Sequence, residues 1–309
     1  MTPREFDAPT ASNSPAAPLP FGSAGSPGRA PNLLSPAGFP DRPTRHRQRR
    51  RQFTLAVLVV AALVMLGSVF GDMRSASSQW QQIFSDDFDS SVALGEFASS
   101  PYASRWSAYD DFADTSGNGR YSVTALSVTG GSLDMYLRTQ DGQPQSAAVV
   151  PLVNGQWGGQ LYGRYEVRFR SDEIPGYKMA FLLWPDTNNW AEGEIDFPEV
   201  GSLESGNALY ANVFPKGDIA SGYPGASVGF TTETAAADSG WHTAVIEWSP
   251  ANITFALDGT TLGTITERVP DTLMHLVLQV ETAIDAPAPA SDVAGHVQVD
   301  AVRVDRYTG

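Results

Sequence analysis

The feature that most constrains the fold is a run of short alternating segments that extends from Ile83 to Tyr307. In 165–170 and in 253–257, apolar residues take every second position, and Gly, Asn, Asp or Pro separates one segment from the next. Alternation of this kind predicts strands, because successive side chains of a strand point to opposite faces. Asp258-Gly259 predicts a hairpin turn, and no helical period appears. We therefore predict an all-β fold, a two-sheet antiparallel β-sandwich of the jelly-roll type.

The first 52 residues differ in composition from the rest of the chain. They are rich in Pro, Ala, Ser and Gly and contain few aromatic residues, so we predict a disordered arm over 1–52. This arm carries eight arginines and three acids, which leaves a net charge of −19 for the remainder. Such an acidic body argues against nucleic acid as a partner, because phosphates need a basic surface. The absence of cysteine excludes disulfides and thiolate metal sites.

A stretch without charges follows a cluster of arginines. Residues 53–70 are eighteen uncharged residues, preceded by the basic run 45–51. As a helix they would span about 27 Å, close to the roughly 30 Å of a bilayer core, so we predict a transmembrane signal anchor. The arginines place the N-terminus in the cytoplasm and the rest of this single-pass protein outside the cell membrane. A cleaved signal peptide is the alternative, although its apolar region is usually shorter.

The remaining boundaries follow from this assignment. We expect a linker over 71–82 and one folded domain over 83–309.

Three carboxylates lie within six residues at 194–199. On a strand, Glu194 and Asp196 share one face, and a β-bulge at Phe197-Pro198 would return Glu199 to it. We expect the two glutamate carboxyl groups to lie about 5–6 Å apart, close to the roughly 5–5.5 Å found in retaining glycosidases. Repulsion between them should raise the pKa of one group. A solvated acidic face or a calcium site is the alternative interpretation.

Three tryptophans lie within forty residues upstream of this stretch, and they are candidates for contact with a sugar ring. Trp157 precedes it, and Trp184 and Trp190 are predicted to lie in a loop just upstream of it. Indole rings are suited to the apolar faces of sugars. A single tryptophan is more often part of the core.

One further strand separates apolar from polar residues. In 274–281, Gln279 and Glu281 are predicted to lie on a hydrogen-bonding face, opposite a face of Met, Leu and Val. Such a face suits the floor of a sugar cleft, which makes both residues candidates for substrate binding. A strand that simply faces solvent would show the same pattern.

Five stretches stand in an order that is typical of one family. They are Phe84–Asp89 (FSDDFD), Tyr162–Arg168 (YGRYEVR), Glu194–Glu199 (EIDFPE), the block from Gly240 to Gly259 (GWHTAVIEWSP…LDG) and Val299–Val304 (VDAVRV). Together with the tryptophans, this ordered set resembles the glycoside hydrolases of family 16, in its laminarinase-like branch. The resemblance spans nearly the whole of the predicted domain. It implies a β-jelly roll and hydrolysis with retention of configuration.

The resemblance also implies a role for each carboxylate. Glu194 corresponds to the nucleophile, and Glu199 corresponds to the acid and then the base. Asp196 would orient Glu194 and help to maintain the protonation states of Glu194 and Glu199. Many family members carry a histidine on the strand that follows this signature. In this chain the corresponding residues are 209–214, and they contain no histidine. Asn212 or Phe214 takes the approximate place, and we expect Asn212 to contact substrate.

The expected activity is that of a retaining endo-glycosidase on a β-linked polysaccharide, with β-1,3-glucan as the preferred substrate. A transglycosylase acting on the polysaccharide of the cell envelope and a carbohydrate-binding module without catalysis are the alternatives. No organic cofactor is implied, although family members often hold a structural calcium ion. We expect the polysaccharide to be the only partner besides the membrane, and the protein to be a monomer.

Overall fold

The computed structural model describes residues 79–309, and these residues fold almost entirely as strands. The strands are β1 Trp80–Asp86, β2 Trp106–Ala108, β3 Arg120–Tyr121, β4 Leu126–Thr129, β5 Ser132–Gln140, β6 Gln143–Pro151, β7 Gly163–Ser171, β8 Tyr177–Pro185, β9 Glu194–Val200, β10 Ala208–Phe214, β11 Val228–Ala235, β12 His242–Trp248, β13 Ile253–Leu257, β14 Thr260–Ile265, β15 Met274–Thr282 and β16 Ala294–Tyr307. The predicted all-β fold is confirmed for this part of the chain.

Helical structure in residues 79–309 is limited to four single turns. These 3₁₀ turns are η2 Phe97–Ser99, η3 Pro101–Ser104, η4 Val123–Ala125 and η5 Trp190–Glu192. Within the described residues, no helix is long and apolar enough to cross a bilayer. The predicted arm over 1–52 and the predicted anchor over 53–70 lie outside the described residues, as does most of the linker.

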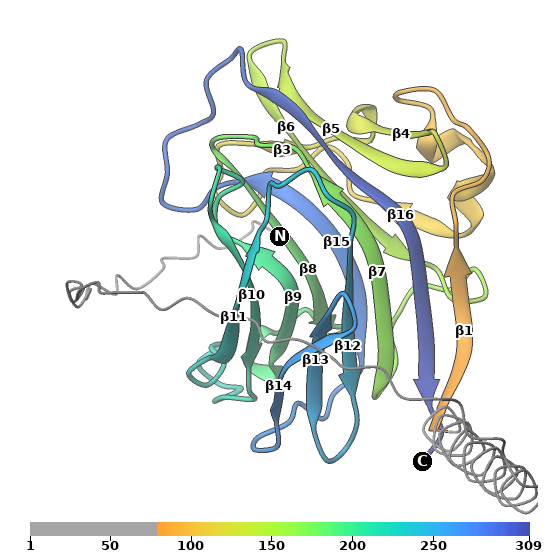
Figure 1. Ribbon diagram of the computed structural model, residues 1–309, viewed down its shortest axis with the longest axis vertical. Helices are drawn as coiled ribbons and strands as arrows, with labels where there is room; N and C mark the ends of the chain where they lie inside the picture. Colours follow the sequence, from red (N-terminus) through yellow and green to blue (C-terminus); the bar gives the residue numbers. More distant parts are fainter. Residues whose placement is uncertain (1–78) are drawn as a thin grey trace, which may run out of the picture. The chain divides into compact units, whose positions relative to one another are not determined.

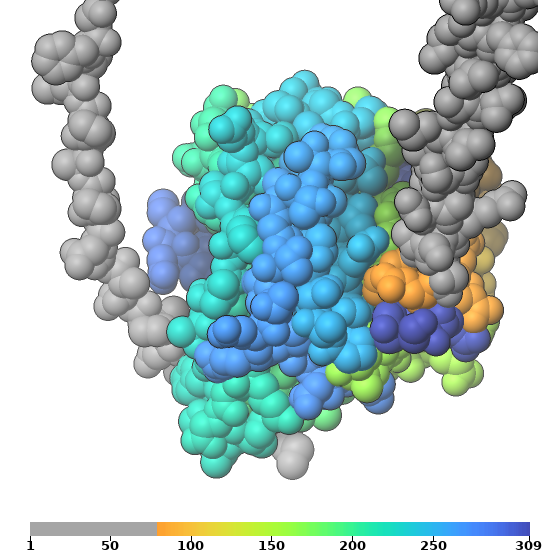
Figure 2. Space-filling model, turned by 60° about the horizontal axis from the view of Figure 1, so that its bottom comes forward, coloured from red at the N-terminus to blue at the C-terminus, as the bar shows by residue number. Residues whose placement is uncertain are grey.

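The strands form one hydrogen-bonded path that folds back on itself as two layers (Figure 1). One layer, called here the carboxylate sheet, has the order β11-β10-β9-β8-β15-β6. The other layer continues as β5-β16-β7-β12-β13-β14, and the β5–β6 hairpin connects the two. β1 pairs with the end of β16, so the first and last described strands lie side by side, as Figure 2 also shows.

Alternate side chains of the two layers meet in a single apolar core. β7 shows strict alternation between buried and half-buried residues, as its sequence predicts. Phe169 of β7 contacts Phe181 of β8 at 5.7 Å between ring centroids, and Phe197 of β9 contacts Phe255 of β13 at 5.6 Å. Burial of side chains this large contributes about 1.5–3 kcal/mol each. The core therefore fixes which face of the carboxylate sheet points inward.

The hairpin prediction at Asp258-Gly259 is confirmed by the pairing of β13 with β14. Asp258 and Gly259 have φ values of 50° and 78°, the left-handed conformation that a two-residue hairpin requires at both positions. A smaller prediction is wrong, since Trp184 and Pro185 belong to the end of β8 and not to a loop. The loop begins after Pro185, and Trp190 opens η5.

Candidate active site

The three carboxylates lie on β9, and the predicted bulge is present. Asp196 pairs with Leu182 of β8 and Glu199 pairs with Ala180, so three steps along β9 face two steps along β8. The extra residue returns Glu199 to the face of Glu194 and Asp196. Phe197 points the other way and is buried in the core. Glu194 and Glu199 are half-buried, so both carboxylates reach the surface of the sheet.

Glu194 is held by the tryptophan that opens η5. The Trp190 indole Nε1 donates a hydrogen bond of 2.6 Å to Glu194 Oε2. The ring of Trp190 lies 5.6 Å from the ring of Phe214 and 6.1 Å from that of Tyr223. These aromatic contacts fix the indole, so the Glu194 carboxylate has a defined orientation.

Asp196 lies between the two glutamates and is almost fully enclosed. Its side chain is 2% exposed, and its Oδ1 atom has no hydrogen-bond partner. An ionised carboxylate in that position would be costly, whereas a protonated one can donate a hydrogen bond to a neighbour. The arrangement therefore favours a neutral Asp196 beside Glu194.

Glu199 accepts a hydrogen bond from the Asn212 side-chain amide of β10. Asn212 pairs with Asp196 across the two strands, and this position brings its amide within reach of the Glu199 carboxylate. Of the two residues expected near the place of the family's histidine, Asn212 is the one that hydrogen-bonds to Glu199, while Phe214 pairs with Glu194. The role of Asn212 toward substrate remains a prediction.

The pKa values of two of the carboxyl groups are raised. Burial raises the pKa of Glu194 to about 7, and the Glu199 charge adds to this. Hydrogen bonds from Asp196 and Trp190 and the positive charge of Lys178 act in the opposite direction. Burial, followed by the charges of Glu194 and Glu199, raises the pKa of Asp196 well above its ordinary value. Burial and mutual repulsion therefore favour the protonated forms of Glu194 and Asp196.

The other predicted tryptophans lie on the neighbouring strands and loops. Trp184 lies on the same face of β8 as Ala180 and Leu182, which pair with the carboxylates of β9. Its Nε1 donates a hydrogen bond of 2.8 Å to Asn188 Oδ1. Trp157 is 54% exposed, and its ring lies 4.9 Å from that of His275, which pairs with Trp184. Trp157 and Trp184 are thus both neighbours of His275. Trp190, by contrast, contacts the row formed by Glu194, Asp196 and Glu199, called here the carboxylate row, through its bond to Glu194.

The predicted polar face of β15 is only partly accessible. Gln279 is half-buried and pairs with Ala180 of β8, beside the position of Glu199. Glu281 is 0% exposed and forms an ion pair of 2.8 Å with Lys178. A carboxylate without exposed surface cannot touch a polysaccharide in this structure. The expectation that Glu281 contacts substrate is therefore corrected, because a buried partner on β8 neutralises it.

Two residues near the carboxylates have no place in the sequence-based prediction. Lys178 is 8% exposed within the apolar strand β8, and Tyr121 of β3 donates to Glu281. A signal for Lys178 did exist, because a lysine flanked by Tyr177 and Met179 in a buried strand must find an acidic partner. Its partner could not be read from the sequence, since β8 and β15 are far apart along the chain.

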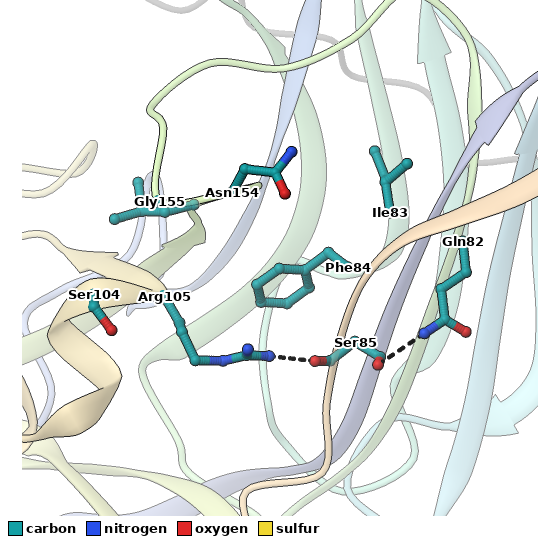
Figure 3. A pocket seen from close by; sticks show the side chains of 9 residues that line it. Gln82, Ile83, Phe84, Ser85, Ser104, Arg105, Asn154 and Gly155 are labelled. Atoms are coloured by element: carbon teal, nitrogen blue, oxygen red, sulfur yellow. Dashed lines mark hydrogen bonds between the residues drawn. The ribbon is translucent and has the colours of Figure 1, made fainter.

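Two pockets lie away from the carboxylate row. A pocket of about 340 Å³ is formed by residues of β1 and the nearby loops, including Phe84, Ser85 and Arg105 (Figure 3). A second pocket of about 560 Å³ is formed by residues of β4, β5 and β16 and by the loop at 91–94. None of the residues that line these pockets is a predicted site residue.

A calcium site does not emerge from the described part of the chain. Among residues 79–309, no group of three or more His, Asp or Glu side chains is arranged to hold a metal ion.

Several solved structures share this fold. The laminarinase from Rhodothermus marinus is 23% identical, with 74% of this chain and 98% of that chain covered and a TM-score of 0.58. The laminarinase catalytic domain from Thermotoga maritima is 21% identical over 75% and 100% of the two chains, with a TM-score of 0.57. The β-glucanase from Bacillus licheniformis is 17% identical over 72% and 97%, with a TM-score of 0.57. At these identities the likeness concerns the fold.

A family model supplies the assignment that the fold alone does not. The model described as glycosyl hydrolases family 16 matches residues 157–297, which include the whole of β9 and its neighbouring strands β8, β10 and β15. No curated protein matches the chain significantly in sequence. Residues 157–297 of this jelly roll therefore match the model of glycosyl hydrolases family 16, and this match identifies the protein as a glycoside hydrolase.

Proposed function

We propose that this glycoside hydrolase is a retaining endo-glycosidase that cleaves a β-linked glucan. The observation that carries the proposal is the bulge of β9, which brings Glu194 and Glu199 to the same half-buried face with Asp196 buried between them. One carboxylate can then attack the sugar while the other donates a proton to the leaving oxygen.

The proposed reaction proceeds in two steps. Glu194 attacks the anomeric carbon and forms a glycosyl ester, while Glu199 protonates the departing oxygen. Glu199 then takes a proton from water, which attacks the ester and frees Glu194. A neutral Asp196 hydrogen-bonds to Glu194, and the Trp190 indole holds its other side. Both contacts keep the nucleophile ionised and oriented.

The choice of a β-glucan rests on the neighbours and on the aromatic surface. The solved structures of similar fold include laminarinases and a β-glucanase. Trp157 is exposed, and Trp184 and Trp190 are half-buried near the carboxylates, where each offers an indole to a sugar ring. We propose β-1,3-glucan as the preferred substrate and internal bonds as the point of cleavage.

The substrate test is a panel of laminarin, lichenan, agarose, carrageenan and galactan, assayed for new reducing ends. We expect activity on laminarin, with products of intermediate length that indicate endo cleavage. NMR of the first product should show retention of the β configuration. Products longer than the substrate at high acceptor concentration would indicate a transglycosylase instead. Binding without any new reducing ends would indicate a carbohydrate-binding module.

The nucleophile has its own test. Glu194→Ala should reduce kcat by about 10⁴-fold or more, because the covalent step is lost. Azide should restore turnover and yield a glycosyl azide of inverted configuration. A Glu194→Ala variant that stays active without azide contradicts the assignment of Glu194 as the nucleophile.

A further inference from the structure

A buried ion pair lies in the carboxylate sheet beside the proposed catalytic residues. Lys178 of β8 and Glu281 of β15 occupy directly paired positions, and their Nζ and Oε1 atoms are 2.8 Å apart. The side chains are 10% and 0% exposed. The chain has only two lysines, and the other, Lys216, forms an exposed pair with Asp271. A buried lysine in so lysine-poor a chain requires an explanation.

The Glu281 carboxylate is engaged by four donors. Its Oε2 atom accepts from the Tyr121 hydroxyl at 2.8 Å and from the Thr115 backbone N–H at 3.0 Å. Its Oε1 atom accepts from Gln279 Nε2 at 3.2 Å in addition to Lys178. Donors to both oxygens hold the carboxylate in one place. Glu281 therefore fixes the position of the lysine charge.

The loop that supplies Thr115 is itself anchored. Asp114 Oδ2 accepts from the Thr282 backbone N–H at 2.9 Å and from the Ser146 hydroxyl at 2.8 Å. These bonds attach the loop to β15 and β6. The donors to Glu281 thus come from a part of the fold that is held from two sides.

Lys178 lies beside the Glu199 end of the carboxylate row. It is two residues from Ala180, which pairs with Glu199, so it follows the same face of β8. Burial lowers the pKa of Lys178, but the charge and hydrogen bond of Glu281 and the charges of Glu199 and Asp196 outweigh this and raise it. The lysine charge in turn lowers the pKa of Glu194 and of Asp196.

Stability alone explains this pair poorly. Removing two charges from water costs several kcal/mol per ion, and apolar residues of similar volume are often as stabilising or more so. A buried cation next to three carboxylates, by contrast, acts on their protonation strongly, because the surroundings screen it little.

We propose that Lys178 is a positioning residue whose buried charge favours the ionised forms among the three carboxylates of β9, and that Glu281 holds the lysine in place and limits its effect. This inference rests on the proposed function of Glu194 and Glu199. The charged and titratable groups around the lysine are Glu281 from β15, the three carboxylates of β9, Tyr121 from β3 and Asp114 from the anchored loop. Among these groups, the lysine is the only cation.

The test compares the pH profiles of kcat/KM for full-length variants. Lys178→Met removes the cation, so the acidic limb should move to higher pH by about half a unit or more. Glu281→Gln leaves the cation unopposed, so the limb should move to lower pH. The double variant should lie between the wild type and Lys178→Met. Lys216→Met is the matched control, and its limb should coincide with that of the wild type.

The opposite shifts distinguish this role from a structural one. If both single variants lose thermal stability while their limbs stay at the wild-type position, the pair is only structural and the inference is wrong. If Lys178→Met does not fold, Glu281→Gln must still move the limb downward, and an unmoved limb overturns the inference.

Two further readouts do not depend on turnover. In protein labelled with ¹⁵N-lysine, the Lys178 side chain should stay charged above the ordinary titration range of a lysine, and titration below that range would overturn the inference. An inactive wild type would contradict the proposed function by itself. In that case, the titration of Glu194 in ¹³C-carboxyl-labelled wild type and in Glu281→Gln still decides whether the lysine acts on it.

Discussion

Trp190 shows how one neutral side chain adjusts the charge of the site. Its indole N–H bonds to Glu194 and opposes the effect of burial, which raises the pKa of Glu194 to about 7. Trp190→Phe removes the bond and keeps most of the ring. We expect the acidic limb of kcat/KM to move to higher pH, because Glu194 must be ionised to attack.

The control for this prediction is Trp157→Phe. Trp157 contacts the ring of His275, and within residues 79–309 its indole donates no hydrogen bond to a carboxylate, so its replacement should change KM and leave the limb in place. If the limb of Trp190→Phe stays in place as well, the indole does not affect the charge of Glu194.

Glu194 should also reduce the stability of the protein above neutral pH. The pKa is raised to about 7 in the folded state from an ordinary value of 4.5, so the folded state binds the proton more tightly. Stability due to this group is present below pH 4.5 and is lost as the pH rises through about 7. At pH 8, Glu194→Gln should therefore unfold at a higher temperature than the wild type, and its free energy of unfolding should be larger by about 1–3 kcal/mol.

Calorimetry at two pH values checks this. The two proteins should differ little near pH 4 and most near pH 8. The exposed Glu204→Gln serves as the control, and it should match the wild type at both values. A Glu194→Gln variant less stable than the wild type at pH 8 would show that the carboxylate stabilises the fold.

At the scale of elements, a histidine connects three parts of the second layer. His242 at the start of β12 bonds through Nδ1 to Asp258 of the β13–β14 hairpin at 2.7 Å. Its Nε2 atom lies 3.0 Å from Asp238 in the preceding loop. Burial lowers the pKa of His242, but the bonds to Asp258 and Asp238 outweigh it and raise the pKa above 6.5.

The stability due to His242 should depend on pH. Because the folded-state pKa is raised, the contribution is fully present below pH 6.5 and is lost as the pH rises through the folded value. We expect His242→Gln to lower the melting temperature more near pH 6 than near pH 9. Equal losses at both values would mean that the charge of the imidazole does not matter.

β9 and β15 show which structural features the residue pattern of a single strand can predict. The alternation in 274–281 correctly separates a core face from a polar face. The bulge at Phe197-Pro198 follows from the spacing of the carboxylates. Neither pattern reveals that Glu281 is fully enclosed, because burial depends on Lys178 of a strand that pairs only in the tertiary structure.

For the whole molecule, the placement in the membrane stays a prediction. Residues 53–70 lie outside the described residues, and the proposal rests on their lack of charge and on the arginines at 45–51. Protease added to intact cells should digest the domain and spare an N-terminal tag, since the arginines retain the N-terminus inside. Digestion of the tag with protection of the domain would reverse the orientation. Release of the domain into the medium would indicate a cleaved signal peptide.

The local order of residues was enough to predict the class of fold and the strand that carries the carboxylates. Period-two alternation and turn residues are local signals, because each strand must present one face to the core. The position of Glu194, Asp196 and Glu199 on one face is also local, since a single bulge sets it. The resemblance to the family depends on the same stretches.

The side-chain contacts between neighbouring strands were decided by the tertiary structure alone. The pairing of Lys178 with Glu281, the bond from Asn212 to Glu199 and the raised pKa of Glu194 all depend on which strands are neighbours. A charge responds to what surrounds it in space and to how well water can reach it. Neither quantity is written in the order of the residues, so the protonation of this site follows only from the folded chain.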